Sequence, residues 1–151
     1  MQISARADYA IRALAELVAA GPGPVKSEHL AQAQHIPGKF LENILSELRH
    51  AGLLLSQRGA DGGYWLARPA AEIALADIIR AVDGPLANIR GRRPETIGYE
   101  GAAIRLSEVW LAVRASLRAV LEHVTLADLV EGPLPPEILD LAQEPEARRP
   151  H

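Results

Sequence analysis

Residues 39–48 repeat apolar and polar positions with the period of a helix. The apolar positions recur three or four residues apart and share one face, while the polar side chains lie largely off it. The apolar set is Phe40, Leu41, Ile44, Leu45 and Leu48, and the polar set is Lys39, Glu42, Asn43, Ser46 and Glu47. Gly52 follows and is expected to end the helix, because glycine readily adopts the left-handed conformation of helix ends. The pattern predicts an amphipathic helix with a polar outer face.

Two strand-like runs follow this helix, at residues 53–57 and 64–67. A glycine-rich tip with the turn pair Asp61-Gly62 joins them, which predicts a hairpin with Arg58 at its tip. A helix followed at once by a hairpin is the arrangement of a winged helix. In that arrangement the helix fits a major groove of DNA, and the wing reaches a neighbouring minor groove or the backbone.

The residues before this unit predict two further helices. Apolar positions at helical spacing follow Ser4, a candidate N-cap, and the Gly-Pro-Gly-Pro run at 21–24 ends that helix. A short helix over 27–33 has Ser27 as its expected N-cap, and residues 36–38 form a tight turn into the next helix. Two helices joined in this way predict a helix-turn-helix. Its expected shared core is Leu30, Ala31, Ile36, Leu41 and Leu45.

Beyond the hairpin, residues 73–82 predict another helix, which Asp83-Gly84-Pro85 terminates. Residues 86–103 lose all periodicity and predict a long exposed loop. A long helix is expected over 104–124, with more apolar surface on one stripe than a small domain can cover. The surplus indicates a second copy of the chain, and the expected dimer-interface residues are Leu106, Val109, Trp110, Val113, Leu117, Val120 and Leu121.

The end of the chain predicts a short helix capped by Thr125, and then a tail rich in proline and glutamate that we expect to be partly disordered. The chain is therefore predicted to be mainly α, a winged helix-turn-helix with a long C-terminal dimerisation helix. The expected divisions are a DNA-binding domain at 1–84, a loop at 85–103, the dimerisation helix with the short helix after it at 104–131, and the tail at 132–151.

Composition excludes several classes of protein. The chain has no cysteine, which rules out disulfides, thiolate zinc sites, thiol catalysis and all-cysteine iron-sulfur ligation. The five histidines show no pair at metal-ligand spacing, so neither a metal site nor a cofactor is expected. No motif arranges serine, histidine and aspartate for catalysis, so an enzyme is not expected. No apolar run is long enough for a membrane span, and we expect a cytoplasmic protein without membrane contact.

The net charge of −3 by itself disfavours a nucleic-acid partner. Residues 1–68, however, carry seven basic and six acidic side chains, a net of +1, whereas the remainder has a net of −4. The winged-helix half is thus only marginally basic. We therefore expect modest nonspecific affinity for DNA, with binding dependent on dimerisation and on a few phosphate contacts.

Five motifs together resemble the Rrf-type family of bacterial transcription regulators, over residues 1 to about 130. The arginine-glycine-glycine-tyrosine wing is the most distinctive of the five. The motifs are Ser4-x4-Tyr9-Ala10, Phe40-Leu41-Glu42-x-Ile44-Leu45-x2-Leu48-x2-Ala51-Gly52-Leu53, Ser56-x-Arg58-Gly59-x2-Gly62-Gly63-Tyr64-x-Leu66, Asp77-Ile78-Ile79-x-Ala81-Val82-Asp83-Gly84 and Thr125-Leu126-Ala127-Asp128-Leu129-Val130.

The resemblance implies a homodimeric winged-helix protein that binds a near-palindromic site on double-stranded DNA, with the long penultimate helix as the dimer interface. It places base-contacting residues at the start of the recognition helix and an arginine that enters the minor groove at the position of Arg58. Asparagine can pair with adenine, and glutamate can accept from cytosine. The candidate DNA-binding residues are Ser4, Arg6, Ser27, Lys39, Glu42, Asn43, Arg58, Gly59, Gly62 and Tyr64.

Some members of the family hold an iron-sulfur cluster through three cysteines in the loop before the long helix. The corresponding loop here, residues 88–102, has none. Asp8 occupies a position that supplies a carboxylate ligand in some members, but a lone carboxylate cannot hold a cluster. The resemblance therefore does not extend to iron-sulfur sensing.

Three functions remain open from the sequence. The first is a sequence-specific transcriptional regulator, more often a repressor in this family. The second is a regulator whose signal is a protein partner or a small molecule that moves the two recognition helices. The third is a partner-binding module that has kept the fold but lost DNA recognition, and the weak positive charge is its only support.

Overall fold

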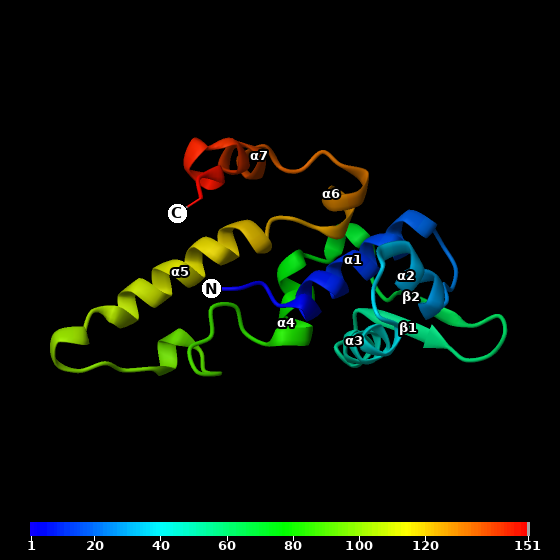
Figure 1. Ribbon diagram of the computed structural model, residues 1–151, viewed down its shortest axis with the longest axis horizontal. Coiled ribbons are helices and arrows are strands. Elements are labelled where there is room, and N and C mark those ends of the chain that lie inside the picture. Colours follow the sequence, from blue (N-terminus) through cyan, green and yellow to red (C-terminus); the bar gives the residue numbers. More distant parts are fainter. Residues whose placement is uncertain (151) are drawn as a thin grey trace.

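Helix α1 (Ala5–Ala20) lies at the centre of the N-terminal domain in the computed structural model, which describes residues 1–150 (Figure 1). Ser4 caps it as predicted, because its Oγ accepts from the Ala7 backbone N–H at 3.0 Å. The buried positions of α1 are mostly small residues, Ala7, Ala10 and Ala13, with Leu14 and Leu17. Small side chains let neighbouring elements approach closely, so α2, α3, α4, α6 and β2 all pack against this helix.

Helices α2 (Ser27–Gln34) and α3 (Gly38–His50) form the predicted helix-turn-helix. His35 adopts the left-handed conformation that closes α2, with φ 53°. The prediction that Ser27 is the N-cap is wrong. Lys26 holds that position in extended backbone, and the Ser27 hydroxyl lies 3.4 Å from Glu28 Oε2. The cause is Val25, which is held in a bridge to Tyr64 and keeps the chain extended up to Lys26.

The hairpin consists of β1 (Leu54–Gln57) and β2 (Gly63–Leu66), paired antiparallel with Gln57 opposite Gly63. The bridge from Val25 adds a short third strand, through bonds of 2.9 and 2.8 Å with the Tyr64 backbone. The turn at the tip is closed by the Gly62 N–H, which donates to the Gly59 carbonyl at 3.1 Å. The left-handed residue of that tip is Gly59, with φ 105°, and not Gly62 as the Asp61-Gly62 pair suggests. A five-residue connection does not need the two-residue turn of a tight hairpin.

Helix α4 (Leu75–Asp83) follows the 3-10 turn η1 (Ala70–Glu72) and ends at Gly84. Helix α6 (Leu126–Glu131) returns to the same domain, capped by Thr125, whose Oγ1 accepts from the Asp128 N–H at 3.1 Å. Backbone bonds from Leu75 to Val124 and from Leu126 to Ile73 join the two segments at 2.9 and 3.0 Å. One apolar core results, made of α1 to α4, the hairpin and α6. Its fully buried large side chains include Leu14, Leu30, Leu41, Leu45, Leu48, Leu54, Ile73, Ile78 and Leu126.

Residues 86–103, which the sequence predicts to be a long exposed loop, are partly buried. They contain the 3-10 turns η2 (Pro94–Thr96) and η3 (Gly101–Ala103), and Pro94 and Ile97 are buried. The turn η2 packs against α5, and Glu95 forms an ion pair with Arg114 of that helix. The hydrogen bond from Arg114 holds the pKa of the Glu95 carboxyl below its ordinary value. Non-local packing therefore orders a segment that lacks any periodicity of its own.

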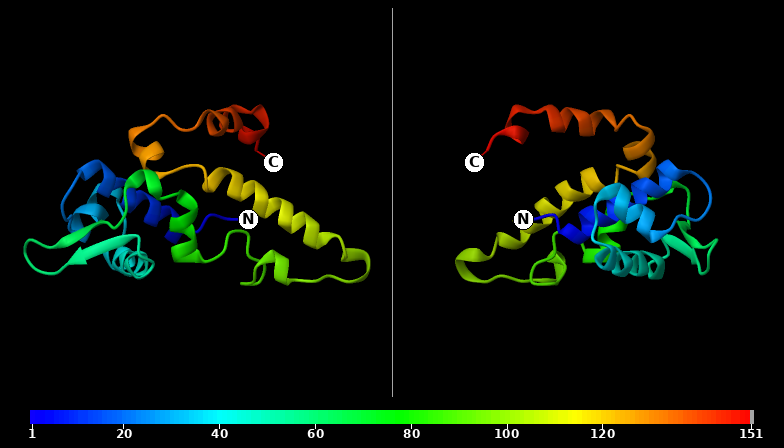
Figure 2. Two further views of the ribbon diagram at one scale, coloured as in Figure 1. Left: turned by 180° about the vertical axis from the view of Figure 1, so that it is seen from behind. Right: turned by 45° about the vertical axis from the view of Figure 1, so that its right-hand side comes forward.

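Helix α5 (Leu106–Leu121) extends away from the N-terminal domain (Figures 1 and 2), and within residues 1–150 nothing buries any of its side chains fully. Its end is anchored by Glu122, whose Oε1 accepts from Arg118 Nε at 2.9 Å and pairs with Arg80 of α4. These hydrogen bonds, from Arg118 first and then Arg80, lower the pKa of the Glu122 carboxyl. The helix is shorter than the predicted 104–124, because it begins only after η3 and the turn that follows it, and it ends at Leu121.

The tail, which the sequence predicts to be partly disordered, contains a short helix and a 3-10 turn. Helix α7 (Pro136–Gln143) and the 3-10 turn η4 (Pro145–Arg148) lie on the opposite side of the molecule from α3 (Figure 1). Pro136 stands at the first helical position, where its missing N–H has no intrahelical role, and Ile138, Leu139 and Leu141 are apolar. His151 lies outside the described residues. Within residues 1–150, no helix combines the length and apolarity that crossing a membrane requires.

Candidate nucleic-acid interface

The outer face of α3 carries three of the predicted base-contacting residues. Lys39, Glu42 and Asn43 are all exposed. The opposite face is anchored in the core, since Leu41 and Leu45 are 0% exposed. A helix held this firmly presents its polar side chains from a rigid support, as recognition of base edges requires.

Phe40 departs from the predicted apolar face. Its side chain is 42% exposed, and its ring meets the edge of Tyr9 of α1, with ring centroids 5.7 Å apart. The Arg12 guanidinium lies 5.4 Å from the centre of the Tyr9 ring. Phe40 therefore packs at the rim of the domain, between the start of α3 and α1, instead of entering the core.

The wing presents Arg58 and Gly59 at its exposed tip. Lys26, just before α2, reaches the same place, because its ammonium group donates to the Gly59 carbonyl at 2.5 Å. A cation therefore stands between the start of α2 and the wing tip. Sequence reasoning missed Lys26, although a lysine directly before the first helix of a helix-turn-helix was the available signal.

Gly62 and Gly63 shape the wing. A Cβ on Gly62 would lie 2.0 Å from the Gln57 carbonyl oxygen, and one on Gly63 would lie 2.5 Å from the Val25 carbonyl oxygen. Gly63 also has φ 150°, which other residues rarely adopt. The half-buried Tyr64 is bonded through its backbone to Val25. These residues of the predicted set hold the strands together beneath the exposed tip.

Ser4 and Arg6 use their side chains inside the domain. The Ser4 hydroxyl donates to Asp83 Oδ2 at 2.5 Å, and Arg6 pairs with Glu47 of α3 and donates to the Val82 carbonyl at 3.0 Å. These contacts tie α1 to both α3 and the end of α4. The predicted residues on α3 and at the wing tip are thus exposed, and Ser27 is half-buried at the start of α2. Ser4 and Arg6 instead link α1 to α3 and α4.

Ion pairs reduce the basic charge available on this surface. Three arginines of residues 1–68 are paired with carboxylates: Arg6 with Glu47, Arg12 with Asp8 at 2.9 Å, and Arg68 with Asp77 at 3.9 Å. The remaining basic side chains of this half are Lys26, Lys39, Arg49 and Arg58. Nonspecific attraction to DNA therefore depends on these four side chains, and the positive electrostatic potential of the domain is weak.

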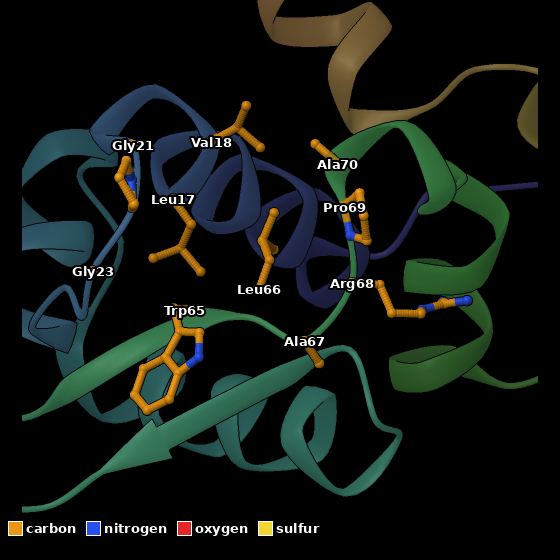
Figure 3. A pocket seen from close by; sticks show the side chains of 11 residues that line it. Leu17, Val18, Gly21, Gly23, Trp65, Leu66, Ala67, Arg68, Pro69 and Ala70 are labelled. Carbon is orange, nitrogen blue, oxygen red and sulfur yellow. The ribbon is translucent and has the colours of Figure 1, made fainter.

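Two of the hollows that adjoin the domain lie beside α1. The larger, of about 510 Å³, lies between the end of α1 and β2. Figure 3 shows its lining, which includes Leu17 and Val18 of α1 and residues 65–68. A second hollow of about 290 Å³ lies between residues 1–4, residues 85–88 and α5. Trp110 lines neither, and its Nε1 donates to the Tyr99 hydroxyl at 3.1 Å.

Comparison with known proteins matches residues 3–132 to the family described as "Rrf2: Iron-dependent Transcriptional regulator". The Mycobacterium tuberculosis (strain H37Rv) protein Rv1287, which bears the name of an HTH-type transcriptional regulator, is 47% identical over 98% of this chain and 92% of its own length. The structure of CymR, titled the global cysteine regulator of Bacillus subtilis, superposes with a TM-score of 0.72 at 34% identity, covering 87% of this chain and 97% of CymR. The structure of IscR from T. potens superposes with a TM-score of 0.69 at 31% identity, covering 100% of this chain and 93% of IscR.

The residues present do not fit an iron-sulfur cluster. The chain has no thiol, and among residues 1–150 no three histidine, aspartate or glutamate side chains are grouped so as to hold a metal. Two carboxylates, Asp8 and Glu95 of the loop before α5, have other partners: Asp8 accepts from Arg12 at 2.9 Å, and Glu95 pairs with Arg114. Arginine at both carboxylates opposes the binding of a further cation there.

Proposed function

Because this chain belongs to the Rrf2 family of transcriptional regulators, we propose that it is a sequence-specific DNA-binding regulator that acts as a homodimer. We propose a repressor, since repressors are the more frequent kind of regulator in this family. The observation that carries this proposal is the exposed polar face of α3, anchored by the fully buried Leu41 and Leu45 beside an exposed wing tip. The named relatives are regulators, which argues against an enzyme. The site of action is the cytoplasm, where operator DNA lies.

In this proposal α3 enters the major groove and the wing lies along the neighbouring minor groove. Asn43 pairs with adenine through its one amide group, whose oxygen accepts from N6 and whose nitrogen donates to N7, and Glu42 accepts from cytosine N4 and disfavours other bases. Lys39, at the start of α3, contacts a phosphate or a guanine edge. Arg58 inserts its cation into the minor groove, which carries a more negative potential where it is narrow.

Helix α5 is the proposed dimer interface. Within residues 1–150 its side chains reach at most partial burial, and Val109, one of the expected interface residues, is 51% exposed. Pairing two copies about a two-fold axis removes such apolar surface from water at about 25 cal/mol per Å². The symmetry sets two recognition helices against one face of DNA, so the operator is nearly palindromic.

The proposed regulator uses no iron-sulfur cluster. We expect protein purified without oxygen to be colourless and to contain no stoichiometric iron, since thiolate ligands are absent from the sequence. Absorption spectroscopy together with iron analysis of the anaerobic protein checks this. A visible charge-transfer band with matching iron content would overturn it.

Two substitutions test the assignment of the DNA surface. We expect Arg58→Ala to weaken binding to all duplexes by about tenfold and to lower the salt dependence, because the lost contact is electrostatic. Glu42→Ala is expected to change which base is preferred at one position, with a discrimination loss of about 1–3 kcal/mol. Both side chains are exposed, so folding should be unaffected. Titration against a set of single-base operator variants measures both effects, and wild-type behaviour of both proteins would refute the assignment.

A regulator controlled by a small-molecule ligand is the second candidate, favoured by the hollow of about 510 Å³ between α1 and β2. A ligand there would touch Trp65 of the wing and Leu17 of α1 together. Such a ligand would shift the wing relative to the recognition helix only if it bound one of the two arrangements more tightly. This version retains DNA binding and adds an effector to it.

A further inference from the structure

Residues 88–93 form a small hairpin turn that presents arginine. Ile89 and Arg92 exchange two backbone hydrogen bonds of 2.8 and 3.0 Å, and Asn88 Oδ1 accepts from the Gly91 N–H at 3.3 Å. The two central residues, Arg90 and Gly91, both have positive φ, 51° and 74°, as a type I′ turn requires. The first of these positions favours asparagine, aspartate or glycine, so arginine is held there in an unfavourable conformation.

The turn is rigidly attached to the rest of the chain. Pro94 and Ile97, just after it, are buried, and the Thr96 hydroxyl donates to the Arg93 carbonyl at 2.8 Å. The Arg92 guanidinium donates to the Thr96 carbonyl at 2.9 Å and so serves the loop itself. Within residues 1–150, the exposed guanidinium groups of Arg90 and Arg93 form no ion pair, and Glu95, on which the charge of Arg93 also acts, is paired with Arg114. Two cations are therefore available on a preorganised support.

The turn lies on the same side of the molecule as the recognition helix α3. Figures 1 and 2 show the molecule in three orientations related by rotation about the vertical axis, and in all three α3 and the segment 88–99 lie along its lower edge. Helix α7 and η4 lie along the upper edge in the same views. A duplex laid against α3 thus passes on the side where this segment lies.

The chemistry of the turn suits a phosphate backbone better than a small anion. Arg90 and Arg93 line neither of the two hollows described above, and both are exposed. A small anionic effector needs a concave site with converging groups, whereas a polyanion is bound by cations spaced along a surface. The winged-helix half keeps only four basic side chains outside ion pairs, so two further cations on the same side of the protein would strengthen a weak attraction to DNA.

We propose that Arg90 and Arg93 bind DNA phosphates beside the recognition helix, so that the segment between α4 and α5 is a second, electrostatic part of the DNA interface. The inference rests on the proposed function, because it assumes that α3 is the element that enters the major groove. It assigns to this segment a direct contact with the nucleic acid, through residues outside the winged helix.

The test compares two variants of the full-length protein that lose equal charge. Arg90→Asn with Arg93→Gln removes the two cations and keeps the turn, because asparagine tolerates the left-handed conformation. The control, Arg148→Gln with Arg149→Gln, removes two arginines at η4 and just after it, on the upper edge. The probe is a duplex recovered from random-sequence DNA by the wild-type protein, titrated between about 50 and 200 mM salt.

We expect the turn variant to bind at least about tenfold more weakly at low salt, with the slope of log affinity against log salt smaller by about 2 to 4 per dimer. The control should match the wild type in both affinity and salt slope. Circular dichroism and sedimentation should show the same fold and oligomeric state for the wild type, the turn variant and the control. Equal affinities and slopes for the two variants would overturn the inference while leaving the proposed function intact. Weaker binding with an unchanged slope would also overturn it, because the arginines would then not touch phosphates. A wild type that recovers no preferred duplex would overturn the proposed function and this inference with it.

Discussion

Replacing Val109 by aspartate is expected to convert the protein from dimer to monomer and to weaken operator binding by about 100-fold or more. Val109 lies on α5 with 51% of its surface exposed, so the folded protomer tolerates a polar side chain there. In the proposed dimer the same position is covered by the partner helix, where desolvation of a carboxylate and repulsion from its two-fold mate oppose association. The loss of DNA affinity follows because two linked half-sites bind far more tightly than one.

Leu111→Asp is the matched control for this variant. Leu111 lies on the same helix, is 42% exposed, and is displaced from Val109 by about 200° around the helix axis. Sedimentation velocity at micromolar concentration measures the oligomeric state of both variants, and titration with operator DNA measures their affinity. A dimeric Val109→Asp protein, or equal dissociation of the two variants, would show that the interface lies elsewhere.

Gly63→Ala is expected to lower the free energy of unfolding by about 1–3 kcal/mol and to cost most of the wing's contribution to DNA binding. A Cβ at this position would lie 2.5 Å from the Val25 carbonyl oxygen, and the backbone has φ 150°. To admit the methyl group, β2 must separate from Val25, which breaks the two backbone hydrogen bonds between Val25 and Tyr64. The wing then loses its attachment to the segment before α2.

Gly98→Ala controls for the loss of glycine itself, because a Cβ there meets no atom within 4 Å. Denaturant unfolding and a DNA titration separate the two effects, and the Gly63 variant should remain dimeric because α5 is untouched. If Gly63→Ala were as stable as Gly98→Ala and bound DNA like the wild type, the close approach of Val25 to the wing would not matter for either property.

Local pattern was sufficient to predict the helix-turn-helix. The period of residues 39–48 is determined by side chains within one helix, and Leu41, Ile44, Leu45 and Leu48 are buried as that period requires. The exposure of Lys39, Glu42 and Asn43 follows from the same pattern. The capping of α1 by Ser4 and of α6 by Thr125 was also predictable, since a cap involves residues only three positions apart.

The errors share a dependence on distant residues. The start of α2 is set by Val25, which pairs with Tyr64 in the hairpin, so Ser27 cannot act as the cap. The DNA contacts expected of Ser4 and Arg6 stay a prediction, but the bonds that these side chains make within the protein were not predictable locally, because their partners Asp83 and Glu47 lie 79 and 41 positions away in the chain. Such pairs become adjacent only when the domain folds, and no local sequence pattern predicts them.

The burial within the segment before α5 and the helix within the tail were not predicted, for related reasons. Pro94 and Ile97 are buried because η2 packs against α5, a contact that residues 86–103 do not signal by themselves. The tail was judged by its proline and glutamate content. The Pro136 to Gln143 segment, however, combines a proline at the first helical position with apolar residues in the following turn, and it forms α7.

The central claim is that two copies of the chain read one nearly symmetric DNA site. The most direct test is to incubate the wild-type protein with duplexes of random sequence, sequence the bound fraction over several rounds, and weigh the resulting complex by sedimentation. The account predicts an enriched site made of two inverted half-sites, spaced by one or more turns of the double helix and bound by one dimer. No enrichment over the starting pool, or a single unsymmetric site bound by one protomer, would contradict it.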